Sequence, residues 1–353
     1  MLGRLRAAAR FFQHKIGWNR VGFVLSLAII IVAAVVLVHT LRDLDLKQVM
    51  HAVKRTDLGH ILAAAAFVAG GYFTLTFYDL FALRTIGRQE IPYRIAALSG
   101  FTSYSIGHNI GATVFTGGAV RYRIYSLYGL SAVEVAKICF IAGLTFWLGN
   151  ATVLGLSVSI EPHAARPITQ LPFWMNRGIA IIMLLVLASY ISWVWSAPRV
   201  IGKGDWLVRL PNGPSTLLQV CIGILDLSCC ALAMYMLLPH EPNVGFVTIL
   251  VVFVTATLLG FASHAPGGLG VFDAAMLVAL WQFNKEDVVA GLLLFRLLYY
   301  ICPFVLALAI LGVRELWLNT RRARPLPEVP ATPIVSVTGP IRTEIEAEKT
   351  DTG

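Results

Sequence analysis

The sequence predicts an all-α polytopic membrane protein, a bundle of about eight transmembrane helices with one or two re-entrant glycine-rich segments. Hydrophobic residues make up 57% of the 353 residues and charged residues only 13%, whereas soluble domains carry about 25% charged residues. The apolar residues occur in runs of about 20, the length that crosses about 30 Å of hydrocarbon. Residues 99–128 are instead glycine-rich and half polar, which is typical of backbone that protein covers or that borders a wet cavity.

Seven runs have the length and apolarity of spanning helices. They cover residues 21–41, 61–83, 132–158, 179–197, 216–238, 244–262 and 288–313. The first run is longer than the 7–15 residues of a usual signal peptide core, and Arg42 and Asp43 follow it, so we expect an uncleaved helix. Two further segments, 95–118 and 264–282, carry glycines and polar groups, and the sequence leaves open whether each spans or re-enters.

The loop cations favour one topology. If 95–118 returns to the side it left and 264–282 crosses, most loop Lys and Arg residues fall on the cytoplasmic side, as the positive-inside rule requires. The alternative, in which 95–118 spans and 264–282 re-enters, divides them more evenly. Both alternatives place the two termini in the cytoplasm. We interpret the net charge of +9 as this topology and attraction to anionic lipid, and expect no nucleic acid partner, because no basic-aromatic module is visible.

The chain divides into three predicted parts. Residues 1–20 form a basic cytoplasmic segment, residues 21–317 the transmembrane domain, and residues 318–353 a disordered cytoplasmic tail, in which five prolines follow Trp317. The five cysteines lie in apolar runs without a C-x-x-C pair. We interpret them as small buried hydrophobic residues and infer no disulfide.

Charged residues inside the apolar runs are candidates for function, because a charge at mid-bilayer costs at least about 2.5–3.5 kcal/mol. They are Asp79, Lys137, Asp226, Asp273 and Arg296. Lys137 lies three residues after Glu134, which favours a local ion pair, and Asp79 is close enough to Arg84 to be interfacial. Two interpretations of Asp226 and Arg296 stay open: they pair and hold two helices together, or they line a polar cavity and balance a charged substrate.

Two arginines follow the glycines of the first unusual segment. Arg121 and Arg123 come directly after Gly117-Gly118, and the planar donor fork of arginine suits phosphate. Together they would hold a phospholipid headgroup at the cytoplasmic face. The alternative is that they are interfacial anchors whose charged ends reach towards water.

The glycines themselves also have two interpretations. Gly107 and Gly111, Gly117 and Gly118, and Gly267, Gly268 and Gly270 either frame a site or serve as packing faces and helix ends. The two segments share a histidine, a Gly-Gly pair and a following charge, which indicates either an inverted transporter repeat or chance. Neither contains a nucleotide-binding fingerprint, and His108 and His264 have no visible third ligand for a metal.

The two motifs also carry a family resemblance. GHNIGATVFTGGAVRYRIYSLYGLS and, far downstream, SHAPGGLGVFDAAM resemble the integral membrane part of the lysylphosphatidylglycerol synthase/flippase (multiple peptide resistance factor) family and shorter inner-membrane proteins that share it. The resemblance covers approximately residues 15–317. It implies an inner-membrane bundle with re-entrant segments that moves aminoacylated phosphatidylglycerol from the inner to the outer leaflet along charged residues within the helices.

Carried over to this chain, the resemblance favours Arg121, Arg123, Asp79, Asp226 and Arg296 as substrate-binding residues. The full set of candidates adds polar residues of the two motifs, namely His108, Asn109, Asp273 and His264. No catalytic residue, cofactor or metal is expected. The full synthases of the family continue into a soluble aminoacyltransferase domain, whereas this chain ends in a proline-rich tail, so we expect that chemistry to be absent and leave enzyme activity open.

Three functions remain after these observations. The first is a flippase-like transporter of an anionic or aminoacylated phospholipid. The second is the membrane subunit of a split aminoacyl- or glycosyltransferase with a soluble partner. The third is a small-solute secondary transporter or a membrane scaffold. The sequence fixes neither the lipid, nor the energy source, nor whether the protein forms a homo-oligomer.

Overall fold

The structure is a computed structural model that describes residues 46–111, 113–204 and 206–322. The predicted basic segment 1–20, the predicted helix 21–41 and residues 323–353 of the predicted tail lie outside the described residues. The described residues up to Leu311 belong to one compact unit, and the candidate site is built within it.

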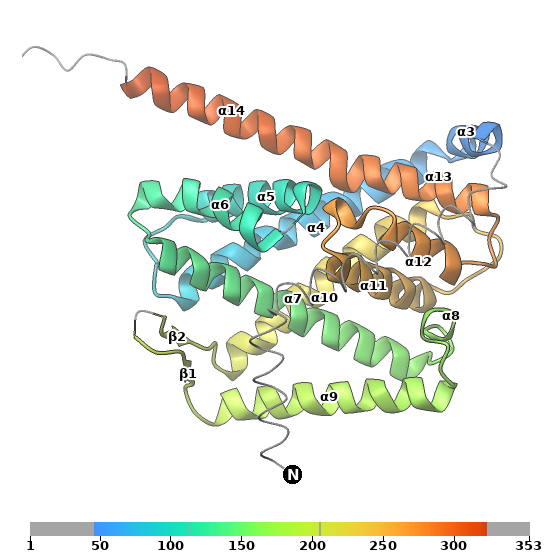
Figure 1. The fold of residues 1–353 in the computed structure, drawn as a ribbon, viewed down its shortest axis with the longest axis horizontal. Coiled ribbons are helices and arrows are strands. Elements are labelled where there is room, and N and C mark those ends of the chain that lie inside the picture. The colour runs from blue at the N-terminus through green and yellow to red at the C-terminus, as the bar shows by residue number, and fades with distance from the viewer. Residues whose placement is uncertain (1–45, 112, 205, 323–353) are drawn as a thin grey trace, which may run out of the picture. The chain divides into compact units, whose positions relative to one another are not determined.

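The described part of the chain is almost entirely helical (Figure 1). The first half contains α3 (Leu46–Arg55), α4 (Leu58–Thr85), α5 (Tyr93–Ile110), α6 (Thr113–Tyr125), a 3-10 turn (Ser126–Tyr128), α7 (Ala132–Ile160), α8 (Arg166–Thr169) and α9 (Phe173–Ser196). A small antiparallel hairpin of β1 (Val200–Ile201) and β2 (Val208–Arg209) follows. The second half contains α10 (Gly213–Leu237), α11 (Phe246–Ser263), a 3-10 turn (Pro266–Gly268), α12 (Val271–Ala279), α13 (Lys285–Phe295), a π-helical segment (Arg296–Ile301) and α14 (Cys302–Arg322).

Six helices among the described residues are long and apolar enough to cross a membrane. They are α4, α7, α9, α10, α11 and the continuous helix Lys285–Arg314, and each matches one of the seven predicted runs. The multi-pass membrane class is therefore supported, while a count of about eight helices remains a prediction. Helix α9 exposes large apolar side chains such as Ile182, Leu185 and Val186, as a helix that faces lipid does.

Local sequence signals fix where several of these helices begin. Asp57 accepts a hydrogen bond from the backbone of Gly59 at the start of α4. Ser131 and Glu134 form a reciprocal capping box at the start of α7, and Asn212 caps α10. Each cap satisfies backbone N–H groups that the helix itself leaves without acceptors.

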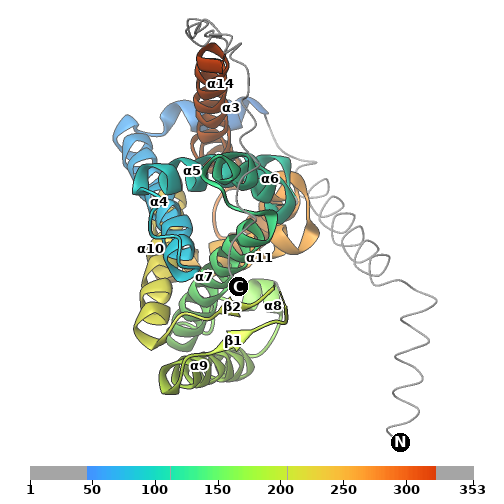
Figure 2. The same cartoon turned by 90° about the vertical axis from the view of Figure 1, so that its left-hand side faces the viewer.

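The predicted segment 95–118 is two helices and not one. Helix α5 ends at Gly111, whose φ of 85° is open to glycine but strained for other residues. Helix α6 then folds back on α5, because a Cβ built on Gly107 would lie 3.5 Å from the Gly117 backbone nitrogen and one on Gly117 would lie 3.1 Å from the Ser103 carbonyl oxygen. The segment is therefore a helical hairpin (Figure 2), and a single helix spanning 95–118 is excluded.

The predicted segment 264–282 also folds back on the helix before it. The chain turns through His264–Gly268, and a Cβ built on Gly260 of α11 would lie 3.4 Å from the Gly268 Cα. Helix α12 has nine residues, about 13 Å at 1.5 Å per residue, so it is too short to cross about 30 Å of hydrocarbon. The loop charges favoured a topology in which residues 264–282 cross the membrane, and α12 by itself is too short for that crossing.

The core forms where α4, α10, α11 and α13 pack together, around buried side chains such as Tyr72, Met234 and Phe295. Helices α7 and α10 cross so closely that a Cβ on Gly149 would lie 2.7 Å from the Gly223 Cα. Small residues permit this approach between membrane helices. The core thus holds α4 and α10, which carry two of the buried carboxylates, against each other.

Candidate functional site

The two glycine-rich turns meet in space although about 150 residues of sequence separate them. A Cβ built on Gly111 would lie 3.1 Å from the Pro266 Cα, and one built on Gly267 would lie 3.6 Å from the His108 carbonyl oxygen. The Asn109 side chain crosses the contact and donates to the Tyr300 carbonyl at 3.0 Å. We call this contact of Gly111, Pro266, Gly267, Asn109 and Tyr300 the glycine junction.

The π-helical segment Arg296–Ile301 supplies one wall of the glycine junction. A π-helical turn interrupts the regular i→i−4 ladder and leaves carbonyl groups for other donors. Two of its carbonyls are used in this way: Tyr299 accepts from the Tyr72 hydroxyl at 2.9 Å, and Tyr300 accepts from Asn109. These bonds attach the segment to α4 and α5.

A bidentate ion pair lies at the glycine junction. Arg296 donates from Nε to Asp273 Oδ1 at 3.0 Å and from Nη2 to Asp273 Oδ2 at 2.6 Å. Its Nη1 lies 3.4 Å from the Gly267 carbonyl oxygen, and its guanidinium carbon lies 5.5 Å from the centre of the Tyr300 ring. Both side chains are 15% exposed. The pair thus links the start of α12 to the π-helical segment and remains partly exposed.

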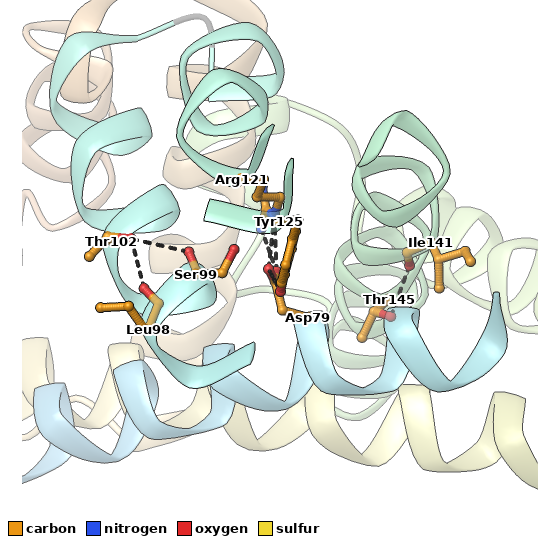
Figure 3. A network of polar contacts seen from close by, with 8 residues as sticks. All are labelled: Asp79, Leu98, Ser99, Thr102, Arg121, Tyr125, Ile141 and Thr145. Atoms are coloured by element: carbon orange, nitrogen blue, oxygen red, sulfur yellow. Dashed lines mark hydrogen bonds and ion pairs between the residues drawn. The ribbon is translucent and has the colours of Figure 1, made fainter. Parts of the chain in front are cut away.

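A second ion pair is completely enclosed (Figure 3). Arg121 of α6 donates from Nε and Nη2 to Asp79 of α4, with distances of 2.8 to 3.2 Å, and the Tyr125 hydroxyl donates to Asp79 Oδ2 at 2.8 Å. The Asp79 side chain is 0% exposed and that of Arg121 4% exposed. Asp79 is therefore buried within the protein and bound to Arg121; its predicted position near the membrane interface stays a prediction, because burial does not give a depth in the membrane.

Aromatic rings connect the enclosed pair with the junction. The Arg121 guanidinium lies 4.8 Å from the centre of the Tyr104 ring, close enough for a cation–π interaction. Tyr104 also contacts the rings of Tyr78 and His108, and His108 stacks on Tyr299. A continuous band of rings thus runs from α6 to the π-helical segment.

Asp226 is the third buried acid and does not pair with Arg296. Its Oδ2 accepts from the Tyr78 hydroxyl at 3.1 Å and its Oδ1 from the Thr74 hydroxyl at 3.3 Å. The predicted direct pairing of Asp226 with Arg296 is therefore wrong, because Arg296 is bound to Asp273. Sequence spacing gave no means of choosing between two acids that lie in different helices.

The other predicted residues are placed as follows. Arg121 is buried whereas Arg123 is exposed, since residues two apart lie on nearly opposite faces of a helix; the two do not form a joint phosphate clamp. His264 is exposed, with a φ of 56° at the end of α11. Among the described residues no group of three His, Cys, Asp or Glu side chains is arranged to hold a metal.

Two local expectations also have definite outcomes. Glu134 pairs with Arg88, whose Nη2 lies 2.6 Å from Glu134 Oε1, so the predicted Glu134–Lys137 pair is not observed among the described residues. The glycines serve as packing faces and turns: Gly107 and Gly117 pack α5 against α6, Gly111, Gly267, Gly268 and Gly270 adopt positive φ in turns, and Gly118 lies against Cys139. That they frame a substrate site stays a prediction.

Sequence reasoning missed the tyrosines. Tyr78, Tyr104, Tyr125 and Tyr300 bond to or lie over the charged groups. A usable signal existed for Tyr125, which follows Arg121 by four residues and therefore shares its helix face. For the others, a tyrosine within an apolar run resembles any other aromatic core residue.

Comparison with known proteins finds relatives that are similar over most of this chain. No family model matches. The chain is 29% identical over 266 residues to the uncharacterized protein slr0712 of Synechocystis, covering 75% of this chain and 82% of that protein. It is 28% identical over 301 residues to the inner membrane protein YbhN of Escherichia coli, covering 82% and 91%. It is 24% identical over 316 residues to the phosphatidylglycerol lysyltransferase of Staphylococcus haemolyticus, covering 85% of this chain but 34% of that protein.

These proteins are homologues of this chain. The family resemblance seen in the two glycine-rich motifs is thereby confirmed over much of the chain. The similarity spans about a third of the length of the lysyltransferases. It supports the interpretation of this chain as a lipid-related membrane protein.

Proposed function

We propose that this protein is a flippase-like transporter of the inner membrane that passes an anionic or aminoacylated phospholipid headgroup through a polar intramembrane cavity at the glycine junction. The observation that carries the proposal is the meeting of two glycine-rich turns around a charged pair that is still 15% exposed. Membrane transporters build substrate sites from interrupted helices at the interface of structural repeats. The homology to phosphatidylglycerol lysyltransferases supports phospholipid as the substrate class.

Arg296 is the proposed phosphate contact. Its guanidinium already binds a carboxylate in the bidentate geometry that also suits phosphate. A headgroup phosphate would take the place of Asp273 on Arg296, and Asp273 would then be free to bind an ammonium group of a zwitterionic or aminoacylated lipid. Arg121 is a weaker choice for this role because Asp79 already occupies its guanidinium in an enclosed site.

The remaining features of the proposal concern topology. We propose that the hairpins α5/α6 and α11/α12 re-enter the membrane, since α6 with 13 residues and α12 with nine are each too short to span the hydrocarbon. In this topology α11 has the length of a span but α12 returns towards the side from which α11 entered, so α11 is not counted as a crossing. Both termini would lie in the cytoplasm, as the loop cations favour. The acyl chains would stay in the bilayer beside α5 and α12 while the headgroup passes between them.

Leaflet exchange in reconstituted vesicles tests the proposal. Fluorescent phosphatidylglycerol in the inner leaflet becomes accessible to an external quencher only after it has crossed. Vesicles with the wild-type chain should exchange the lipid faster than protein-free vesicles, and Arg296→Ala should lower the rate about tenfold or more. Arg209→Ala, in the exposed β2 strand, is the matched control and should leave the rate unchanged. A wild-type rate equal to that of empty vesicles, or an unchanged rate in Arg296→Ala, would refute the mechanism.

A second function is favoured by one observation, the similarity to longer relatives that are phosphatidylglycerol lysyltransferases. A membrane subunit of a split transferase would need a soluble partner that supplies the aminoacyl or glycosyl group. It predicts that phosphatidylglycerol is modified only when the chain and that partner are reconstituted together, without exchange by the chain alone. Exchange by the purified chain alone favours the transporter.

A further inference from the structure

Asp226 lies in the packed interface between α10 and α4 and is 5% exposed. A Cβ built on Gly71 of α4 would lie 3.7 Å from Asp226 Oδ1, so the carboxyl is pressed against the facing backbone. Besides the Tyr78 and Thr74 hydroxyls, the Cys230 sulfur lies 3.9 Å from Oδ1. Both carboxyl oxygens are therefore held by neutral partners.

The titratable groups around Asp226 are all tyrosine hydroxyls and cysteine thiols, which carry no charge when protonated. They are Tyr72 and Tyr78 from α4, Tyr104 from α5, Cys229 and Cys230 from α10 itself, and Tyr299 from the π-helical segment. Within the described ranges, no lysine, arginine or histidine faces this carboxyl. Asp79 has Arg121 and Asp273 has Arg296, whereas Asp226 has hydroxyl donors only.

An unpaired carboxylate in a low-dielectric interior is costly, and such a group becomes neutral by binding a proton. The ionised form also has a donor, because the Tyr78 hydroxyl donates to Oδ2 at 3.1 Å. The Thr74 hydroxyl has a single proton and lies closer to the Gly71 carbonyl oxygen, at 2.6 Å, than to Asp226 Oδ1, at 3.3 Å. We propose that Asp226 is a proton-binding site that couples proton movement to the movement of the lipid headgroup. The coupling rests on the proposed function, whereas the proton binding rests on the surroundings of Asp226 alone.

The proton step is a simple exchange. A carboxylate oxygen of Asp226 takes up a proton to form the neutral acid, and the same proton later leaves to water, with the Tyr78 hydroxyl on Oδ2 as the nearest group that can relay it. In that relay the Tyr78 O–H bond breaks as the hydroxyl passes its proton on and re-forms with the proton from Asp226; no atom changes its oxidation state.

The site adjoins the π-helical segment, so its charge can act on the glycine junction. Tyr72, which is close to Asp226, donates to the Tyr299 carbonyl, and the next residue, Tyr300, lies against Arg296. Protonation removes the negative charge of Asp226, and these contacts carry the change to the segment that holds the proposed phosphate contact. Because such coupling is reciprocal, the proton and an anionic headgroup strengthen each other's binding.

Infrared spectroscopy of the full chain in lipid nanodiscs tests the proton binding directly. A protonated carboxyl gives a C=O stretching band that moves in deuterated water and disappears as the pH rises. We expect this band in the wild type at neutral pH, its loss in Asp226→Asn, and its retention in Glu241→Gln, which alters an exposed loop carboxyl. Wild-type and Asp226→Asn spectra that match at every pH would overturn the proposal.

A second variant guards against misfolding of Asp226→Asn. Tyr78→Phe removes a hydrogen bond that stabilises the ionised carboxylate, so the band should persist to higher pH than in the wild type. An unchanged pH profile in a folded Tyr78→Phe protein would count against Asp226 as the titrating group.

A pH gradient across reconstituted vesicles tests the coupling. The gradient should change the net direction of phosphatidylglycerol exchange in the wild type and in Asp226→Glu, and should have no effect in Asp226→Asn. A response of Asp226→Asn equal to that of the wild type would refute the coupling, as would wild-type exchange that ignores the gradient. No wild-type exchange at all would refute the proposed function instead, and the infrared result would still decide the proton site.

Discussion

The pairs Asp79–Arg121 and Asp273–Arg296 have the same chemistry but different surroundings. Both are bidentate contacts between an arginine and an aspartate. The first is sealed between α4 and α6, with side chains 0% and 4% exposed, and the second is 15% exposed on both sides at the meeting point of two turns. The difference teaches that a charged residue in an apolar run is not by that fact alone a substrate contact. A substrate contact must also be exposed enough for a ligand to reach it.

Removing the arginine of the enclosed pair should have the largest effect on stability. Arg121→Met leaves the Asp79 carboxylate buried without a cation, which costs about 3–5 kcal/mol. Unfolding in mixed detergent micelles, followed by tryptophan fluorescence, measures the change.

The matched control removes both charges at once. Asp79→Leu combined with Arg121→Met should recover most of the lost stability, because replacing a whole buried pair with apolar residues is often neutral. Lipid exchange by this double variant would show that the pair is structural. A double variant that is stable but exchanges no lipid would indicate that Asp79 and Arg121 contribute to the substrate path.

The hydroxyl on the enclosed pair should contribute less. Tyr125→Phe keeps the ring but removes the hydrogen bond to Asp79 Oδ2, and a bond to a charged group contributes about 1.5–3 kcal/mol. The same unfolding assay measures it, and Tyr128→Phe, which alters an exposed tyrosine in the following turn, is the control. Equal unfolding midpoints for the two variants would contradict a role for Tyr125 in the pair.

Breaking the partly exposed pair should cost still less stability while affecting transport more. Arg296→Ala is expected to lower stability by about 1–2 kcal/mol, because the Asp273 carboxylate that remains is partly exposed rather than enclosed. The comparison with Arg121→Met should therefore separate the two sites: a large loss of stability for one and a large loss of exchange in a folded protein for the other. If Arg121→Met instead lost exchange in a folded protein and Arg296→Ala mainly lost stability, Arg121 would be the substrate contact and Arg296 the structural residue.

The surface charges between α4 and α5 should matter least. A hydrogen bond from its own backbone N–H, followed by one from Arg88, lowers the pKa of Glu90 below its usual value. The resulting contribution is present above the unfolded-state pKa and is lost as the pH falls through the folded-state pKa. Glu90→Gln should thus lower stability slightly at pH 7, only slightly since the side chain is exposed, and the difference from the wild type should vanish below about pH 4. A difference in the unfolding assay that is as large in acid as at pH 7 would contradict this assignment.

The sequence predicted the helices well because their signals are local. Apolar run lengths located six spans to within a few residues, the capping residues of α4 and α7 are adjacent to the helices they start, and the glycines of 95–118 and 264–282 marked segments that do not behave as ordinary spans. The weak similarity between those two segments also pointed to residues that meet at the glycine junction. Their function as a site remains a prediction.

The partners of the charged residues could not be predicted in the same way. Asp79 finds Arg121 at a separation of 42 residues and Asp273 finds Arg296 at 23, and nothing in the chain distinguishes these pairings from Asp226 with Arg296. Likewise Glu134 bonds to Arg88 across a loop, although Lys137 is closer in sequence. Pairing energy depends on distance and burial, which only the packed helices define.

Composition and periodicity alone determined that this chain is a membrane protein of long apolar helices with two interrupted segments, because the hydrocarbon interior imposes the same length and polarity on every helix that crosses it. Only the tertiary structure decided that both interruptions are hairpins whose turns touch, that one ion pair is sealed and another reachable, and that Asp226 has hydroxyl groups where the other acids have arginines. These outcomes depend on which helix faces pack against each other. That packing is determined by contacts between residues that are far apart in the chain.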